Sequence, residues 1–220
     1  MLFGILIDRS VIKVVIHYPN GQARPSHQLS KPTILEGNKK SNFANRGMRF
    51  EEAINQSNDY YLSRNIAVVH KKPTPVQIVS VDYPRRSAAV IKEAYFKEAS
   101  TTDYNGVYKG RYLDFEAKET KNKTSFPLKN FHQHQITHMK MCGNQGGLCF
   151  VLLWFSTIQR CFFYPSPLLV SYWETSQRKS LPLGVIEQNG IEISLGIAPR
   201  IPYIQAVDAY IQSKETQYGK

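Results

Sequence analysis

Acidic and basic side chains that could work with a divalent cation are concentrated in residues 101–118, which read TTDYNGVYKGRYLDFEAK. The second half of this segment alternates apolar with polar residues. This pattern predicts a β-strand with Asp114, Glu116 and Lys118 on one face and the apolar side chains packed inward. Asp103 stands a short way upstream. Mg²⁺ prefers oxygen ligands and keeps several of its waters, so the carboxylates of Asp103 and Glu116 would be enough to hold it.

The chemistry expected of such a group is attack on a phosphodiester. The cation would polarise the phosphate and lower the pKa of a bound water. The Lys118 ammonium would orient that water or offset the charge that develops on phosphorus. An acid two residues before a lysine also occurs by chance in unrelated proteins, so the spacing alone favours a solvated strand face over a metal site.

The segments around this stretch alternate between helical and extended patterns, which predicts a mixed α/β fold. Helices are expected over residues 47–65, 125–141, 168–174 and 201–214, and strands over 66–71, 147–156 and 160–165. Asn65 is the expected terminator of the first helix. Two apolar-rich arms within residues 76–97 predict an extended hairpin, although the second arm also fits a helix.

The charge balance favours a polyanionic partner. Lysine and arginine outnumber the acids by 28 to 17, and the formal net charge is +11. Nucleic acid and an anionic membrane surface would both suit this charge. Residues 21–46 are rich in Gly, Pro, Ser, Asn and Lys, which predicts a flexible basic arm that either grips phosphates or serves as a solvated linker.

The length suits one compact domain with an extension. We expect a leader and arm over residues 1–45, a domain over 46–214 and a tail over 215–220. The three cysteines form no CxxC pair, so neither a disulfide framework nor a zinc ribbon is predicted. No apolar run approaches the ~20 residues of a membrane span. The expected location is therefore the reducing cytoplasm, with no membrane contact.

The chain resembles the RecU family of Holliday junction resolvases, members of the PD-(D/E)xK nuclease superfamily. The resemblance runs from FANRGM at Phe43 through IAVVHKKPTPVQIV, DYPRRSAAVIKEAYF and STTDYNGVYKGRYLDFEAKETKNKTSFPLKNFHQHQITHM to APRIPYI. It implies a restriction-endonuclease-like fold, with a central mixed sheet flanked by helices and a protruding stalk at about residues 76–96. It also implies a homodimeric, Mg²⁺-dependent endonuclease that nicks two opposed strands of a four-way DNA junction symmetrically.

The same resemblance assigns roles to individual residues. Four of them would bind the metal: Thr101, Asp103, Glu116 and Gln135. Lys118 would stabilise the transition state. The candidate DNA contacts are two arginines of the stalk and two lysines that follow the acidic strand: Arg85, Arg86, Lys121 and Lys123. Because a neutral amide oxygen binds Mg²⁺ less strongly than a carboxylate, Gln135 could also act through a water.

Other polar residues have simpler explanations. Asp114 lies on the same strand face, but the family pattern gives it no ligand role, and a salt bridge to Arg111 or Lys118 would account for it. His134 and His138 stand four apart on an expected helix, the spacing of a zinc pair. No third ligand is evident, so partly exposed helix histidines are the expectation.

The competing hypothesis is a non-catalytic DNA-binding or strand-annealing protein, in which the acids are structural and Mg²⁺ has no effect. The resemblance itself implies strand annealing and a regulatory contact with the RecA recombinase beside the nuclease activity, and an association with the nucleoid. Composition supports neither of these additional roles.

Overall fold

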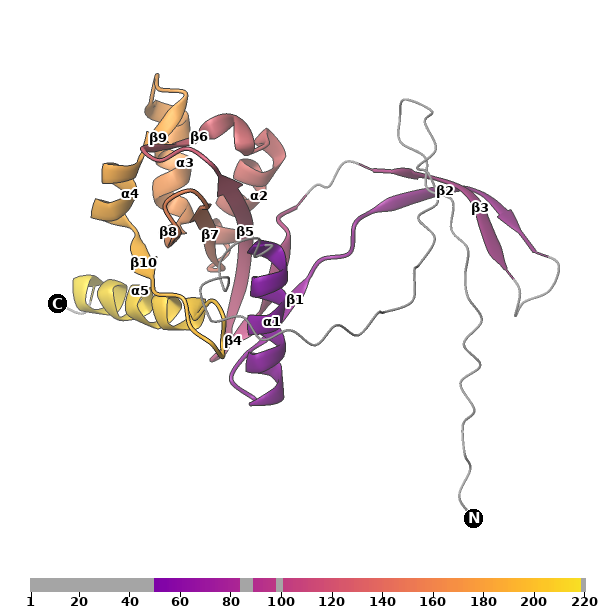
Figure 1. Cartoon of the computed structure of the whole chain (residues 1–220), viewed down its shortest axis with the longest axis horizontal. Helices are drawn as coiled ribbons and strands as arrows, with labels where there is room; N and C mark the ends of the chain where they lie inside the picture. The colour runs from indigo at the N-terminus through magenta and orange to yellow at the C-terminus, as the bar shows by residue number, and fades with distance from the viewer. Residues whose placement is uncertain (1–49, 84–88, 98–100, 219–220) are drawn as a thin grey trace, which may run out of the picture. The chain divides into compact units, whose positions relative to one another are not determined.

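The structure is a computed structural model that describes residues 50–83, 89–97 and 101–218. The chain divides into two compact units. Among the described residues, the smaller unit holds one β-hairpin and the larger unit holds the remaining helices and strands (Figure 1). The predicted basic arm lies outside the described residues, and so do Arg85 and Arg86.

A six-stranded mixed sheet forms the centre of the larger unit. The strand order is β1, β4, β5, β7, β8, β10; β5 and β7 are parallel, and the other neighbours are antiparallel. The strands are β1 (Val68–Lys71), β4 (Tyr104–Tyr108), β5 (Arg111–Thr120), β7 (Leu148–Phe155), β8 (Arg160–Pro165) and β10 (Ile191–Ile193). Because a parallel pair needs a long crossover, the connection from β5 to β7 has room for a helix.

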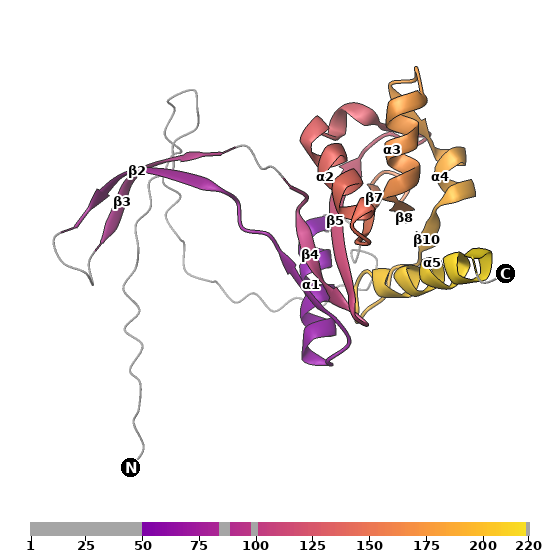
Figure 2. The same cartoon turned by 180° about the vertical axis from the view of Figure 1, so that it is seen from behind.

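Helices cover both faces of this sheet (Figures 1 and 2). One face is covered by α1 (Phe50–Ser63) and α5 (Tyr203–Tyr218), and the other by α2 (Gln133–Asn144), α3 (Ser166–Thr175) and α4 (Leu183–Asn189). A second, two-stranded sheet joins β6 (Ser125–Pro127) to β9 (Ser180–Pro182), and a short 3₁₀ helix, η2 (Leu128–Asn130), follows β6. The predicted mixed sheet flanked by helices is confirmed.

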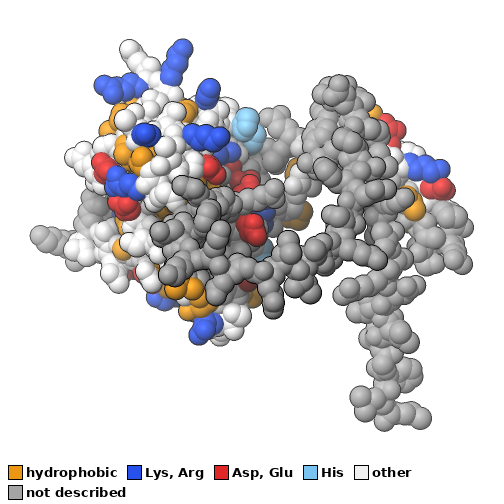
Figure 3. Space-filling view, viewed as in Figure 1, with side chains coloured by type: hydrophobic (Ala, Val, Ile, Leu, Met, Phe, Trp, Pro, Cys, Tyr) orange, Lys and Arg blue, Asp and Glu red, His pale blue; other side chains and the backbone are white. Residues whose placement is uncertain are grey.

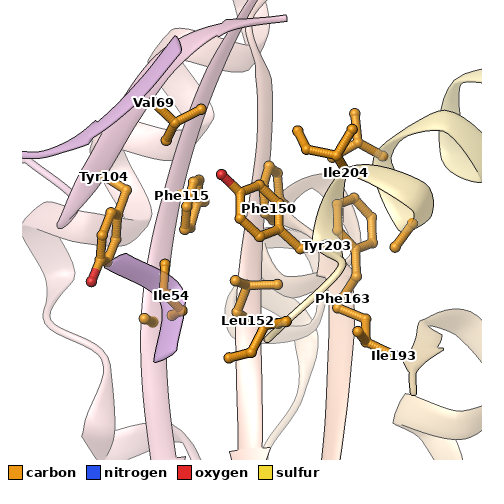
Figure 4. Packing of buried hydrophobic residues seen from close by; sticks show 14 of the residues in the cluster. Ile54, Val69, Tyr104, Phe115, Phe150, Leu152, Phe163, Ile193, Tyr203 and Ile204 are labelled. Atoms are coloured by element: carbon orange, nitrogen blue, oxygen red, sulfur yellow. The ribbon is translucent and has the colours of Figure 1, made fainter. Parts of the chain in front are cut away.

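A row of aromatic rings crosses the sheet on the face that α1 and α5 cover. Phe115 of β5 stacks on Tyr104 of β4 at 4.8 Å and on Phe150 of β7 at 4.6 Å, and Phe150 lies 4.5 Å from Phe163 of β8. Tyr203 of α5 packs against Phe115 and Phe150 (Figure 4). A slip of one residue would move every ring to the other face, so this row determines the register of the central strands.

Strand β5 is buried on both faces. Leu113 and Phe115 belong to the aromatic face, while Asp114 and Glu116, which point to the opposite face, are also fully buried. Strands in the middle of a sheet covered on both sides normally carry apolar residues on both faces. The interpretation of this strand as a solvated face therefore fails for both acids.

The hairpin of the smaller unit consists of β2 (Val76–Asp82) and β3 (Val90–Phe96), which pair antiparallel with register shifts near Ser80. The second arm is therefore a strand, and the helical alternative is wrong. Several large apolar side chains of β2 are exposed, among them Ile78 and Val79.

The elements differ from the predicted ones mainly where they are short. Strands β4, β6, β9 and β10 and helix α4 were not predicted, since three to seven residues carry little periodic signal. The helix expected from residue 125 begins at Gln133, after β6 and η2, and the last helix continues to Tyr218. Asn65 does follow the first helix, in a left-handed conformation with φ of 54°. In the part of the chain that the structure describes, no helix is long and apolar enough to cross a membrane.

Close contact between β1 and β4 leads to a first prediction. Gly106 lies opposite Val69, and a Cβ at Gly106 would come within 2.1 Å of the Val68 carbonyl oxygen. Gly106→Ala should force β1 away from β4 and lower the free energy of unfolding by about 1–3 kcal/mol. Urea unfolding of both proteins measures this. Gly143→Ala is a matched control, because among the described residues no atom outside its chain neighbours and its own helix backbone lies within 4 Å of the added Cβ. Equal stability of all three proteins would contradict the prediction.

Candidate active site

Glu116 is the centre of the candidate site. It lies in the middle of β5, and its side chain has no exposed surface. One carboxylate oxygen, Oε1, accepts hydrogen bonds from Gln135 Nε2 at 2.8 Å and faces Lys118 Nζ at 2.8 Å. The other, Oε2, accepts a hydrogen bond from the main-chain N–H of Asp103 at 3.1 Å. Residues from β5, from α2 and from the segment before β4 therefore meet at this carboxylate.

Asp103 immediately precedes β4, and β4 pairs with β5 so that Tyr104 lies opposite Phe115. This register brings the Asp103 main chain next to the Glu116 side chain. The Asp103 carboxyl group is close enough to contribute to the raised pKa of Glu116. The two acids that the sequence singled out therefore do converge, on neighbouring segments of one sheet.

The electrostatics of the pair favour a bound cation. Burial raises the pKa of Glu116 to about 8, the Asp103 carboxyl group adds to the rise, and Lys118 opposes it. A single ammonium group does not compensate two buried or half-buried carboxylates, so a divalent ion would restore the charge balance. The two carboxylate groups also supply the oxygen donors that Mg²⁺ prefers. The residues present fit the predicted metal.

Lys118 follows Glu116 by two residues on the same strand face, as predicted. Its side chain is 20% exposed and its ammonium group pairs with Glu116. It therefore lies between the buried carboxylate and the solvent, where a phosphate group could approach it.

Gln135 is buried in the first turn of α2 and does reach Glu116. Its amide nitrogen faces the carboxylate, while its Oε1 accepts the main-chain N–H of His132 at 3.0 Å and caps the helix. In this orientation Gln135 orients Glu116, and direct ligation would require the amide to turn over. Thr101 is half-buried, and its hydroxyl donates to the Thr102 carbonyl oxygen at 3.3 Å. The metal-binding roles of Gln135 and Thr101 stay predictions.

A second buried carboxylate lies beside the first. Asp114 accepts hydrogen bonds from the Thr102 hydroxyl, from Lys72 Nζ at 2.7 Å and from the Tyr112 hydroxyl at 2.9 Å. His138 Nε2 lies 3.2 Å from Asp114 Oδ1. Burial opposes ionisation, but these donors outweigh it, so the pKa of Asp114 is lowered.

The partners predicted for Asp114 were wrong. Arg111 pairs with Glu215, and Lys118 pairs with Glu116. The true partner, Lys72, is 42 residues away in sequence. Only the pairing of β1 with β4 brings it near, and no short-range pattern encodes that pairing.

His138 and His134 do not form the metal pair that their spacing allows. His138 faces Asp114 and Cys142, and the donor atoms of these three residues lie within 4.8 Å of one another. The His134 ring instead stacks on His132 at 5.4 Å. Because Lys72 already neutralises Asp114, a metal ion at this cluster would have to displace an ammonium group from a buried ion pair.

The remaining predicted residues fall into two groups. Lys121 and Lys123 are exposed in the connection that follows β5, and so both are available to a partner. The stalk arginines at 85 and 86 lie outside the described residues.

Comparison with known proteins points to one family. The family model for RecU, described as Recombination protein U, matches residues 45–209. Similar curated proteins are named Holliday junction resolvase RecU. They include those of Lactiplantibacillus plantarum (57% identical over 203 residues, 90% of this chain and 97% of the relative) and Ligilactobacillus salivarius (54% over 210 residues, 90% and 99%). The protein of Latilactobacillus sakei is 56% identical over 204 residues, covering 90% of this chain and 97% of the relative.

A solved structure is more distantly similar. That of Archaeoglobus fulgidus Hjc, a Holliday junction resolvase, matches with a TM-score of 0.37 and 14% identity, over 66% of this chain and 95% of that chain. These values are too low for a comparison of the two sites.

The raised pKa of Glu116 predicts that metal binding releases a proton. Below about pH 8 the metal-free side chain is largely protonated, whereas a cation binds its carboxylate form. Mg²⁺ or Mn²⁺ affinity should therefore rise with pH up to about 8 and then level off. Calorimetric titration in two buffers of different ionisation enthalpy measures the released proton.

The exposed Glu119 provides the matched control. Glu119→Gln removes a carboxylate from the opposite face of the same strand, and the variant should release the same proton as the wild type when metal binds.

In the absence of metal, the raised pKa of Glu116 should make the stability of the protein depend on pH. Glu116 releases its proton near its ordinary pKa of 4.5 in the unfolded chain and near 8 in the folded chain. The free energy of unfolding should therefore fall as the pH rises from about 4.5 to about 8. A metal affinity that does not change between pH 4.5 and pH 8 would contradict the prediction that metal binding releases a proton from Glu116.

Proposed function

The chain belongs to the RecU family, and from this premise we propose that it is a metal-dependent endonuclease that resolves Holliday junctions. One observation carries the proposal. Asp103 and Glu116 converge, with Lys118 beside them, in a buried group whose charge a cation would balance. A purely structural role would not require two acids to be held so close together with one lysine.

We assign distinct tasks to the side chains. Mg²⁺, when bound, would polarise the scissile phosphate and supply an activated water. Asp103 and Glu116 would hold the ion. Gln135 holds the Glu116 carboxylate in place by a hydrogen bond of 2.8 Å. Lys118, which lies between Glu116 and the solvent, would donate to the phosphate oxygen that gains charge during attack.

The DNA would approach over a basic surface next to this site. Five exposed side chains follow β5 or border the β6–β9 sheet: Lys121, Lys123, Lys129, Arg178 and Lys179. We call this group the basic rim. The two segments are joined by the pairing of β6 with β9 and by a hydrogen bond from Leu128 N–H to the Lys179 carbonyl oxygen at 3.0 Å.

Figure 3 shows Lys and Arg side chains gathered toward the end of the larger unit where β6 and β9 lie in Figure 1. Within the described ranges, no carboxylate forms an ion pair with any residue of the basic rim. These charges are therefore available to phosphates. Arg178 and Lys179 were not predicted as DNA contacts, because only the pairing of β6 with β9 brings them beside Lys121 and Lys123.

The finer features of the proposal follow from the substrate. A four-way junction has approximate two-fold symmetry, and an isologous homodimer would present two equivalent sites for symmetrical nicks. We therefore extend the proposal to a homodimer. Strand annealing and modulation of the RecA recombinase remain predictions from the family resemblance, and the basic rim would suit the first of them.

Removing either acid should separate cleavage from binding. Asp103→Asn and Glu116→Gln should each lower the nicking rate by about a hundredfold or more, because the ion loses a ligand, while junction affinity stays within about twofold. Denaturing electrophoresis of a synthetic mobile four-way junction measures nicking, and gel mobility shift measures binding. Glu119→Gln, on the opposite face of β5, should behave as the wild type.

The same assay decides between the two functions. Paired nicks with Mg²⁺ and none with EDTA are expected of a resolvase. Binding or annealing of the junction that is indifferent to both, with no nicks from the wild type, would establish the non-catalytic DNA-binding alternative instead.

The basic rim makes a separate prediction about salt. The double variant Lys129→Gln/Lys179→Gln should reduce the slope of log affinity against log salt concentration by up to about 2, since each lost phosphate contact releases fewer counterions. Lys109→Asn is the matched control. Lys109 lies at the opposite end of β5, pairs with Asp208 and has φ of 46°, which asparagine tolerates. Equal slopes for wild type and double variant would remove this surface from the proposal.

A further inference from the structure

We propose that Asp114 is a positioning residue: its buried carboxylate joins Lys72 to Thr102 and so holds Asp103 in place beside Glu116. The inference rests on the proposed nuclease function, because it concerns the geometry of the same metal site. It assigns to Asp114 a role in the arrangement of the ligands, with no contact to metal or DNA.

The contacts of Asp114 show that its carboxylate is fully engaged by the protein. Its side chain has no exposed surface, and it accepts hydrogen bonds from three residues: Lys72, Thr102 and Tyr112. His138 Nε2 lies 3.2 Å away. Lys72 Nζ also donates to the Thr102 hydroxyl at 3.0 Å. A buried carboxylate with a complete set of donors forms one defined arrangement, and loss of its charge would leave the Lys72 ammonium without its counterion.

This arrangement is connected directly to the metal ligand. Thr102 is the residue before Asp103, so the Thr102–Asp114 hydrogen bond fixes the chain on one side of it. On the other side, Lys72 N–H donates to the Asp103 carbonyl oxygen at 2.7 Å. The Asp103 N–H donates to Glu116. The N–H and the carbonyl group of Asp103 are thus both held. Asp114 in turn contacts Thr102, which precedes Asp103 in the chain, and Lys72, which donates to the Asp103 carbonyl oxygen.

The topology explains why this position needs an anchor. Lys72 is the last residue before the segment that enters hairpin β2–β3, and Thr102 follows the segment that returns from it. The two are 30 residues apart in sequence. Closing a long loop at its base costs conformational entropy, and without a strong contact the residues at the base would sample many positions. Asp114 provides that contact next to the ligand whose position matters most.

The spacing on β5 makes the effect specific. Asp114 and Glu116 are two residues apart on the same face, so one strand determines where both carboxylates lie. Asp114 holds the segment of Asp103 through Thr102, and Glu116 accepts the hydrogen bond from the Asp103 N–H. A change at Asp114 should therefore alter the distance between the two metal-binding carboxylates without removing either of them.

The test compares Asp114→Asn with the wild-type protein. The variant keeps the shape of the side chain but loses the charge that holds Lys72. Mn²⁺ affinity, measured by calorimetry without DNA, should weaken by about 10–100-fold, the range found when a group that orients a metal ligand is removed. The turnover rate on a synthetic junction should fall, junction affinity and KM should stay within about twofold, and added Mn²⁺ should restore part of the rate.

Two further variants serve as control and replacement. Glu119→Gln removes an exposed carboxylate from the opposite face of β5, outside the contacts of Asp114, and it should keep wild-type Mn²⁺ affinity. Thr102→Val removes the link between Asp114 and the segment of Asp103, and it should weaken Mn²⁺ binding as Asp114→Asn does. If Asp114→Asn does not fold, Thr102→Val decides the question.

The outcomes separate this inference from the proposed function. A folded Asp114→Asn protein with wild-type Mn²⁺ affinity and wild-type turnover would overturn the positioning role, even if the wild type nicks junctions normally. If instead Asp114→Asn binds Mn²⁺ weakly but the wild type never nicks, the positioning role stands and the nuclease function fails.

Discussion

Two carboxylates buried on one face of a central strand are the constraint on which the rest of this structure depends. A charged group in the interior is costly unless it is paired, and the protein solves the problem differently for each acid. Asp114 receives an ammonium group and a full set of hydrogen bonds, so its pKa falls. Glu116 is buried close to a second acid, so its pKa rises despite Lys118. The first is therefore suited to hold structure and the second to bind a cation.

The aromatic row on the other face of the sheet makes this contrast possible. The stacking of Tyr104, Phe115 and Phe150 determines the register of β4, β5 and β7. Only in this register does Asp103, the residue before β4, lie next to Glu116. Helix α2 then closes the acidic face, and Gln135 uses one amide group both to cap that helix and to orient Glu116. Core packing and site geometry are thus two sides of the same strands.

The sequence was informative where its signals are local. Alternation predicted β5 and placed Glu116 and Lys118 on one of its faces, and the long helices and buried strands showed clear periodicity. Short elements such as β9 and β10 escaped, because three residues have no period. The environment of Asp114 could not be predicted, since it requires Lys72 from β1's end, Thr102 from the approach to β4 and His138 from α2 to meet. Only long-range strand pairing brings such residues together.

The position of Lys72 connects these arguments. Its main-chain N–H donates to Asp103 and its ammonium group pairs with Asp114, so one residue contacts both the segment of Asp103 and the buried carboxylate of Asp114. It also directly precedes the segment that enters the β2–β3 hairpin. Any force transmitted along that segment must pass through Lys72 before it can reach the rest of the larger unit. A rigid ion pair between Lys72 and Asp114 would resist it, because breaking the pair would leave two uncompensated charges in a largely buried environment. The ion pair would thereby keep the segment of Asp103 in place beside Glu116.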